Sequence, residues 1–186
     1  MLLFHLIFIP MKKLLFSFFV LLTFISSKCE DDTPKNPIDL LPPATQIGAN
    51  TFGCLVDGEA FTPDGRPLSL INQYTYSNNG YYFSVSGSKS GNGFFKSISL
   101  ATEELELGLV EGNIYNLTEI RKNNAYATYY FYSTHKIQGS TSEEYKGEMI
   151  ITRFNENVIS GTFWFDVMDT DGVVHKIREG RFDIKN

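Results

Sequence analysis

Short runs of alternating apolar and polar residues follow one another from residue 51 to residue 186, and helical spacing is almost absent. A period of two places alternate side chains on opposite faces of a β-strand, and Gly, Asn and Asp between such runs favour turns. The segment 102–105 could begin a helical turn, but it is too short to continue. We therefore expect strands at 51–56, 59–62, 81–86, 94–101, 113–118, 125–133, 145–154, 158–168 and 173–184.

The clearest pattern lies in residues 145–184, where turn residues separate three runs. Consecutive strands joined by short turns form an antiparallel meander. The middle run carries two sets of side chains on opposite faces: Ile159, Phe163, Phe165 and Val167 on one, and Ser160, Thr162, Trp164 and Asp166 on the other. The apolar set is expected to face the core. Gly180 stands where the apolar phase of the last run shifts, which predicts a β-bulge.

These runs predict the fold class. About nine or ten short strands in about 140 residues form an all-β domain, either an antiparallel β-sandwich or a partly closed barrel. The domain is expected to end in the three-stranded meander. The chain has no internal repeat of the length that would indicate a solenoid.

Residues 1–28 have the layout of a bacterial lipoprotein signal peptide. Lys12 and Lys13 precede an apolar run over 14–25. This run has the length of a secretory core and is shorter than the roughly 20 residues that span a membrane. Cys29 follows, and acylation of its thiol and of the new amino terminus would attach the chain to lipid. The sequence thus predicts a lipoprotein of the cell envelope, anchored in the outer membrane at its periplasmic face or on the cell surface.

Two features of the leader leave alternatives open. Lys28 stands directly before Cys29, where such signals usually carry Gly, Ala or Ser. Residues 1–10 are also apolar, so that Met11 is a second candidate for the first residue. The alternative to cleavage is an N-terminal membrane helix that is retained and is broken near Pro10.

Residues 29–46 are expected to form a tether between the anchor and a single β domain over 47–186. The tether holds four of the seven prolines of the chain, and such a segment extends as a semi-rigid spacer. Removal of the leader leaves 13 basic and 21 acidic residues and a net charge of −8. This charge argues against nucleic acid or anionic lipid as the main partner.

Three segments of the chain carry a resemblance to a known group. Residues 42–58, placed after a cysteine and an acidic tether, and the segments 159–163 and 179–183 resemble an uncharacterised family of Bacteroidota lipoproteins. The resemblance implies an exported all-β lipoprotein with a domain of unknown function. It implies no catalytic residues, because the family has none assigned. The acids Glu30, Asp31 and Asp32 resemble a surface-display signal of the same bacterial group.

Motifs for catalysis or for a cofactor are absent from the sequence. Asp169 and Asp171 flank a turn and are weak candidates for Ca²⁺ ligands, although such a turn between strands is usually only a turn. The hairpin acids Asp57, Glu59 and Asp64 are weak candidates for a glycosidase pair. Cys54 is expected to be a buried apolar residue, because nothing local joins it to the histidines at 135 and 175.

An excess of aromatic residues is the best indication of function. On a strand over 125–133, Tyr126, Tyr130 and Tyr132 share one face, and Trp164 lies on the polar face of its own strand. Tyrosine offers a flat apolar ring with a polar tip, which suits sugars and peptides, although such residues also cover and stabilise sheets. These four residues are the candidate ligand site, on the prediction that they form one continuous surface.

Three classes of function remain open from the sequence. The first is a lipid-anchored, non-enzymatic module without a cofactor that binds a glycan or protein ligand. The second is a carboxylate-based hydrolase of the envelope, which requires converging carboxylates or a His–carboxylate pair. The third is a structural subunit of an envelope assembly, which requires an uncovered sheet edge or a broad apolar face.

Overall fold

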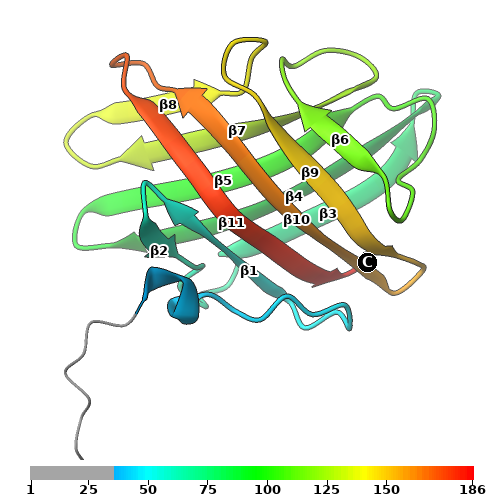
Figure 1. Ribbon diagram of the computed structural model, residues 1–186, viewed down its shortest axis with the longest axis horizontal. Helices are drawn as coiled ribbons and strands as arrows, with labels where there is room; N and C mark the ends of the chain where they lie inside the picture. Colours follow the sequence, from blue (N-terminus) through cyan, green and yellow to red (C-terminus); the bar gives the residue numbers. More distant parts are fainter. Residues whose placement is uncertain (1–35) are drawn as a thin grey trace, which may run out of the picture. The chain divides into compact units, whose positions relative to one another are not determined.

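A computed structural model describes residues 36–186, and it has an all-β fold (Figure 1). The predicted signal peptide, Cys29 and the first part of the predicted tether lie outside the described residues. A single 3-10 turn, η1 (Pro37–Leu40), precedes the strands. No helix within residues 36–186 is long and apolar enough to cross a membrane.

Eleven strands belong to one mixed sheet that is not closed into a barrel. Their bounds are β1 (Thr51–Val56), β2 (Glu59–Phe61), β3 (Leu70–Ser77), β4 (Gly80–Gly91), β5 (Phe94–Glu103), β6 (Ile114–Leu117), β7 (Asn124–Tyr132), β8 (Lys136–Ser140), β9 (Gly147–Phe154), β10 (Val158–Met168) and β11 (Val174–Lys185). The order across the sheet is β2-β1-β11-β10-β9-β6-β7-β5-β4-β3, with β8 paired to β7.

The sheet folds over into two layers. Strands β3, β4, β5, β7 and β8 form one layer, and β6, β9, β10, β11, β1 and β2 form the other, which crosses over the first in Figure 1. A single parallel pair, Leu117 of β6 with Ala125 of β7, joins the layers at one side. The prediction of an antiparallel sandwich or a partly closed barrel is therefore confirmed.

Aromatic side chains fill the space between the layers. The ring centroids of Phe83 in β4 and Phe182 in β11 are 5.9 Å apart, and those of Tyr74 in β3 and Phe154 in β9 are 5.2 Å apart. Gly87 of β4 allows the Phe52 ring of β1 to approach, because a Cβ there would lie 2.5 Å from that ring. Interior space is thus filled by side chains, as in a sandwich.

The predicted meander is present as β9, β10 and β11. All four residues predicted to face the core from β10, which are Ile159, Phe163, Phe165 and Val167, are buried. The pairing of β10 with β11 shifts by one residue between Phe163 and Phe165, which places a bulge just before Gly180. Glu179 adopts the left-handed conformation of this bulge, with a φ of 54°. Gly180 itself is needed because a Cβ there would lie 2.4 Å from the Phe163 ring.

Two strands were not predicted, and one predicted turn is absent. β8 has exposed polar residues at both ends, and in β3 the adjacent Leu70 and Ile71 are followed by Asn72 and Gln73, so neither strand shows a clear run of alternating apolar residues and both sequences look like loops. Residues 102 and 103 continue β5 instead of beginning a helical turn, since Thr102 is buried and its hydroxyl accepts the N–H of Phe83.

The described part of the predicted tether lies against the β domain. Leu41 is buried, and residues 45–49 run along the outer face of β11, where they surround the buried carboxylate of Asp183. This carboxylate accepts hydrogen bonds from the Thr45 and Ser160 hydroxyls and from the N–H groups of residues 47, 48 and 49. These residues pack as part of the β domain, so a semi-rigid spacer is limited to residues that precede them.

Candidate functional site

The outer face of the β3–β4–β5–β7–β8 layer brings the predicted tyrosines together with residues of four other strands. Ala125, Ala127 and Tyr129 of β7 are buried between the layers, so Tyr126, Tyr130 and Tyr132 point outward. Their exposure differs: Tyr132 is 48% exposed, while Tyr126 and Tyr130 are partly exposed.

Strand register extends this face into three rows that run across the layer. The first row is Ile71, Ser86, Ser99, Thr128 and Ser140, the second is Gln73, Ser84, Ala101 and Tyr126, and the third is Ser88, Ser97, Tyr130 and Gln138. We call these three rows the serine–tyrosine face. None of its residues is charged. Charged residues occur in the next rows along the strands, as Glu103 at one end and Lys136 at the other.

Hydroxyl groups of this face contact one another. The Ser99 hydroxyl donates to the Ser86 hydroxyl at 2.8 Å, and the Ser86 and Ser97 hydroxyls are 3.0 Å apart. Beside them a hollow of about 480 Å³ is lined by Gln73, Thr75, Ser84 and Tyr126, with Tyr82 and Glu103 at its end. The face therefore offers both a flat array of hydroxyls and a shallow recess.

Tyr126 keeps its phenol proton at neutral pH. Burial, and then the charge of Glu103, raises the pKa of Tyr126. Tyr130 packs edge-on against Phe95 at 5.8 Å, and the Lys136 ammonium lies 5.6 Å from the centre of its ring. Tyr126 therefore presents a neutral donor and acceptor to the hollow, while Lys136 covers part of Tyr130.

Trp164 is not brought to these tyrosines. It lies on the outer face of β10, in the other layer, and is 37% exposed. Its indole N–H donates to Glu148 at 3.3 Å, and the Arg178 guanidinium lies 5.3 Å from its ring centre. Two hollows, of about 470 and 400 Å³, are lined by Trp164 and Glu148 and by charged residues such as Arg181 and Lys146. The predicted four-residue site therefore divides into two surfaces.

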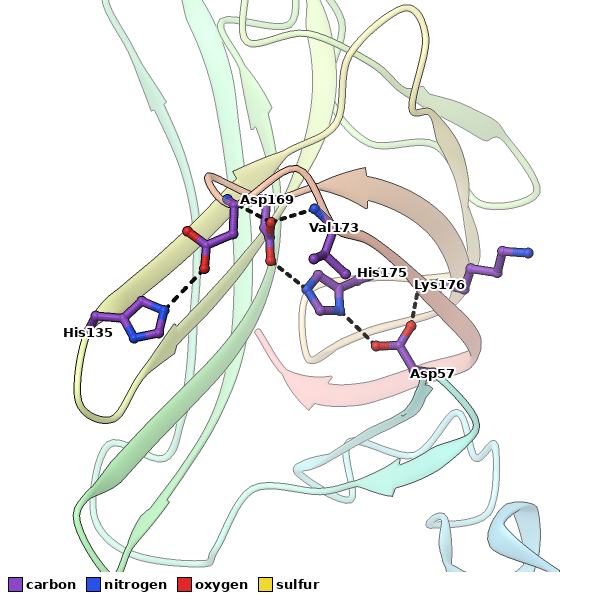
Figure 2. A network of polar contacts seen from close by, with 7 residues as sticks. Asp57, His135, Asp169, Val173, His175 and Lys176 are labelled. Atoms are coloured by element: carbon purple, nitrogen blue, oxygen red, sulfur yellow. Dashed lines mark hydrogen bonds and ion pairs between the residues drawn. The ribbon is translucent and has the colours of Figure 1, made fainter.

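A polar network that the sequence did not predict lies at one end of the sandwich (Figure 2). The His175 ring stands between two carboxylates, with Nδ1 2.7 Å from Asp57 and Nε2 2.9 Å from Asp169. Its side chain is 14% exposed, and it stacks on the Tyr129 ring at 4.3 Å. The network joins the β1–β2 turn, the β10–β11 turn and strand β7, which are far apart in the sequence.

Protonated His175 satisfies both carboxylates at once. Burial alone would lower the pKa of His175, but hydrogen bonds and charges of Asp57 and Asp169 outweigh it and raise the pKa. Burial, followed by the charges of the same two carboxylates, raises the pKa of the stacked Tyr129 to about 12. Both ring nitrogens of His175 are engaged, so this His–carboxylate group has no free nitrogen to act as a general base. The His175 ring instead links the β1–β2 turn to the β10–β11 turn through Asp57 and Asp169.

We expect the contribution of His175 to stability to decline as the pH rises. Its folded-state pKa lies above the unfolded value of about 6.5, so the stabilisation is complete below that pH and is lost through the folded-state pKa. A His175→Phe variant keeps a ring on Tyr129 and loses the two hydrogen bonds. Urea unfolding should show the variant less stable by about 1–2 kcal/mol near pH 6, with a smaller difference near pH 9. An equal difference at both pH values would contradict this account.

The other predicted candidates show no catalytic arrangement. Asp64 accepts hydrogen bonds from Arg66, which lower its pKa, whereas a glycosidase acid needs a raised one. Asp171 pairs with His135 at 3.1 Å, and Glu59 begins strand β2. Cys54 is buried as predicted, and this burial raises the pKa of its thiol and opposes a nucleophilic role.

Asp169 stabilises the turn between β10 and β11. One of its carboxylate oxygens accepts the N–H groups of Asp171 and Val173, each at 2.9 Å, and the other contacts His175. Among residues 36–186 no group of three or more His, Cys, Asp or Glu side chains is arranged to hold a metal ion.

Comparison of the chain with family models, with curated proteins and with solved structures finds no significant match. A function for this chain is therefore inferred from the geometry of the molecule and from its sequence.

Proposed function

We propose that this chain is a lipid-anchored domain of the cell envelope that binds a glycan through the serine–tyrosine face and is not an enzyme. The observation that carries the proposal is the open, uncharged outer face on which Tyr126 and Tyr130 lie among serine and threonine hydroxyls. Hydroxyls and tyrosine rings can hydrogen-bond to sugars and stack on them, and they cost far less to desolvate than charged groups. The envelope location rests on the predicted signal peptide and on the resemblance of the chain to Bacteroidota lipoproteins.

A protein ligand is the alternative within the binding class. Stable protein interfaces have an apolar core with aromatic and arginine anchors. The serine–tyrosine face has few large apolar side chains outside its tyrosines, and this supports the glycan. The hydrolase alternative is less well supported, because Asp57 is held by the His175 ring and the Lys176 N–H, and Asp64 by Arg66.

Substitution of the tyrosines tests the binding role. The full chain in detergent is incubated with protein-free envelope polysaccharide, and bound protein is measured after sedimentation. A Tyr126→Ala/Tyr130→Ala variant should bind at least about 30-fold more weakly, because two central aromatic contacts are lost. The matched control is Tyr76→Ala/Tyr145→Ala, two tyrosines away from the face. Equal binding by both variants would contradict the proposal.

The anchor is tested separately by a Cys29→Ser substitution in cells fed a labelled fatty acid. The variant should lose the lipid label and should keep the mass of the uncleaved chain, because the acylated thiol is required before cleavage. If the variant still fractionates with membranes and the unsubstituted chain carries no label, a retained N-terminal membrane helix replaces the lipid anchor.

A further inference from the structure

We propose that the ligand of the serine–tyrosine face is an uncharged, extended polysaccharide that lies across the strands, along the rows of hydroxyls. This inference rests on the proposed function and names the chemistry of its ligand. It follows from the register of five strands, from the absence of charge over three rows, and from the position of the hollow at Tyr126.

The hydroxyls form a ladder that crosses the layer. Ser86, Ser99, Thr128 and Ser140 are successive partners on β4, β5, β7 and β8, so they repeat at the strand spacing of about 4.8 Å. Ser97 and Tyr130 lie in the parallel row, about 7 Å further along the strands. Ser99 donates its proton to Ser86 and so offers a ligand only acceptor lone pairs, whereas the Thr128 and Ser140 hydroxyls can donate to a sugar hydroxyl or accept from it. A repeating ladder of this kind fits a repeating ligand.

The lack of charged residues in the three rows favours an uncharged polysaccharide over an anionic one. Residues with charged side chains make up 20% of the chain, yet the three rows contain none. An anionic polymer would need lysine or arginine within the face, as carboxylate and sulfate groups pair with such cations. Two charges from the neighbouring rows reach the face, Glu103 in the hollow and the Lys136 ammonium 5.6 Å from the centre of the Tyr130 ring, and their opposite signs give no net preference for either sign of ligand.

The hollow runs along one side of the hydroxyl ladder, from β3 to β7. Tyr126 lines it together with Ser84 and with Gln73, whose amide adds a donor and an acceptor. The Tyr126 phenol remains protonated beside Glu103, so it can donate to a sugar oxygen while its ring contacts the sugar. A flat polymer on the hydroxyl ladder could therefore insert one ring into this hollow.

Paired charge substitutions at Ser99, in the middle of the ladder, test this inference. The variants are Ser99→Glu and Ser99→Arg, with Asn157→Glu and Asn157→Arg in the exposed β9–β10 turn as matched controls. Binding of the full chain in detergent is measured on polystyrene beads that carry neutral mixed-linkage β-glucan, neutral mannan, acidic polygalacturonate or a denatured protein. Thermal unfolding of each variant verifies that the fold is retained.

The expected result is binding to a neutral polysaccharide that both Ser99 variants weaken by about tenfold or more, since either charge must be desolvated against an uncharged ligand. Binding should change less than about twofold between about 50 and 500 mM NaCl. Binding to polygalacturonate alone, strengthened by Ser99→Arg, would overturn the inference that the ligand is uncharged. It would leave the proposed glycan-binding function standing. Binding to the protein beads alone would overturn both the polysaccharide ligand and the glycan-binding function. Polysaccharide binding that neither Ser99 nor the Tyr126/Tyr130 substitutions alter would overturn the proposed function itself.

Discussion

Replacement of Asp183 by alanine is expected to destabilise the domain by about 3–5 kcal/mol, because it leaves several buried donors without an acceptor. Asp183 is 1% exposed, and its carboxylate accepts five hydrogen bonds. The bond from the Thr45 hydroxyl is 2.6 Å long, and the bond from the Gly48 N–H is 2.8 Å long. Residues 45–49 should detach from β11 in the variant. Urea unfolding measures the loss, and accelerated amide exchange at residues 47–49 locates it.

The same carboxylate predicts acid sensitivity. Burial alone would raise the pKa of Asp183, but the hydrogen bonds from Thr45, Ser160 and the backbone lower it to about 2, from an unfolded value of 3.8. A lowered pKa contributes stability that is present above about pH 4 and is lost as the pH falls towards 2, amounting to about 2 kcal/mol. An Asp183→Asn variant should lack this part of the acid dependence.

Asp39, which is exposed and lies in the 3-10 turn, provides the control. An Asp39→Ala variant should unfold at nearly the same urea concentration as the unsubstituted chain. A loss of less than about 1 kcal/mol in Asp183→Ala would show that water replaces the carboxylate at little cost. That result would contradict the role assigned to this carboxylate.

Replacement of Gly180 by alanine should cost about 2–3 kcal/mol through overpacking. The new methyl group would lie 2.4 Å from Cδ2 and Cε2 of the Phe163 ring. That ring cannot move away easily, because it packs against Phe52, Phe165 and Phe182 at centroid distances of 5.4, 6.3 and 6.4 Å. The free energy of unfolding, measured in urea, should fall accordingly.

Gly91, at the end of β4, is the matched control for Gly180. Its nearest neighbour, an atom of the Phe94 ring, would be 4.0 Å from a new Cβ, so Gly91→Ala should leave the stability almost unchanged. Equal effects of the two substitutions would contradict the role of the Phe163 ring, because the restriction of the unfolded chain by alanine alone is stabilising.

The sequence was most informative where one face of a strand is apolar and turns are short. The strand 158–168 alternates cleanly between apolar and polar residues, and its predicted bounds agree with β10. The bulge near Gly180 was also predictable, because an extra residue reverses the faces on which later apolar side chains lie. Strands β3 and β8 were not predictable: each lies at a side of its layer, β8 is mainly polar, and β3 begins with two adjacent apolar residues followed by two polar ones, without clear alternation.

The candidate site was only partly predictable, because strand pairing creates it. Alternation placed Tyr126, Tyr130 and Tyr132 on one face, but Ser86 and Ser99 join them only through the register of β4, β5 and β7. The same limit applies to the His175 network, whose carboxylates lie 118 and 6 residues away along the chain. A cluster of serines spaced by two within 84–90 and 97–99 was the one signal that could have indicated the face.

The most direct test of the account locates the bound ligand on the protein. Amide NMR spectra of the full chain in detergent are recorded during titration with soluble mixed-linkage β-glucan and with fragments of the envelope polysaccharide. The account predicts that shifts concentrate at Ser86, Ser99, Thr128 and Tyr126, and that the indole N–H of Trp164, the single tryptophan, does not move. Shifts centred on Trp164 or His175, with the serine–tyrosine face unchanged, would contradict it.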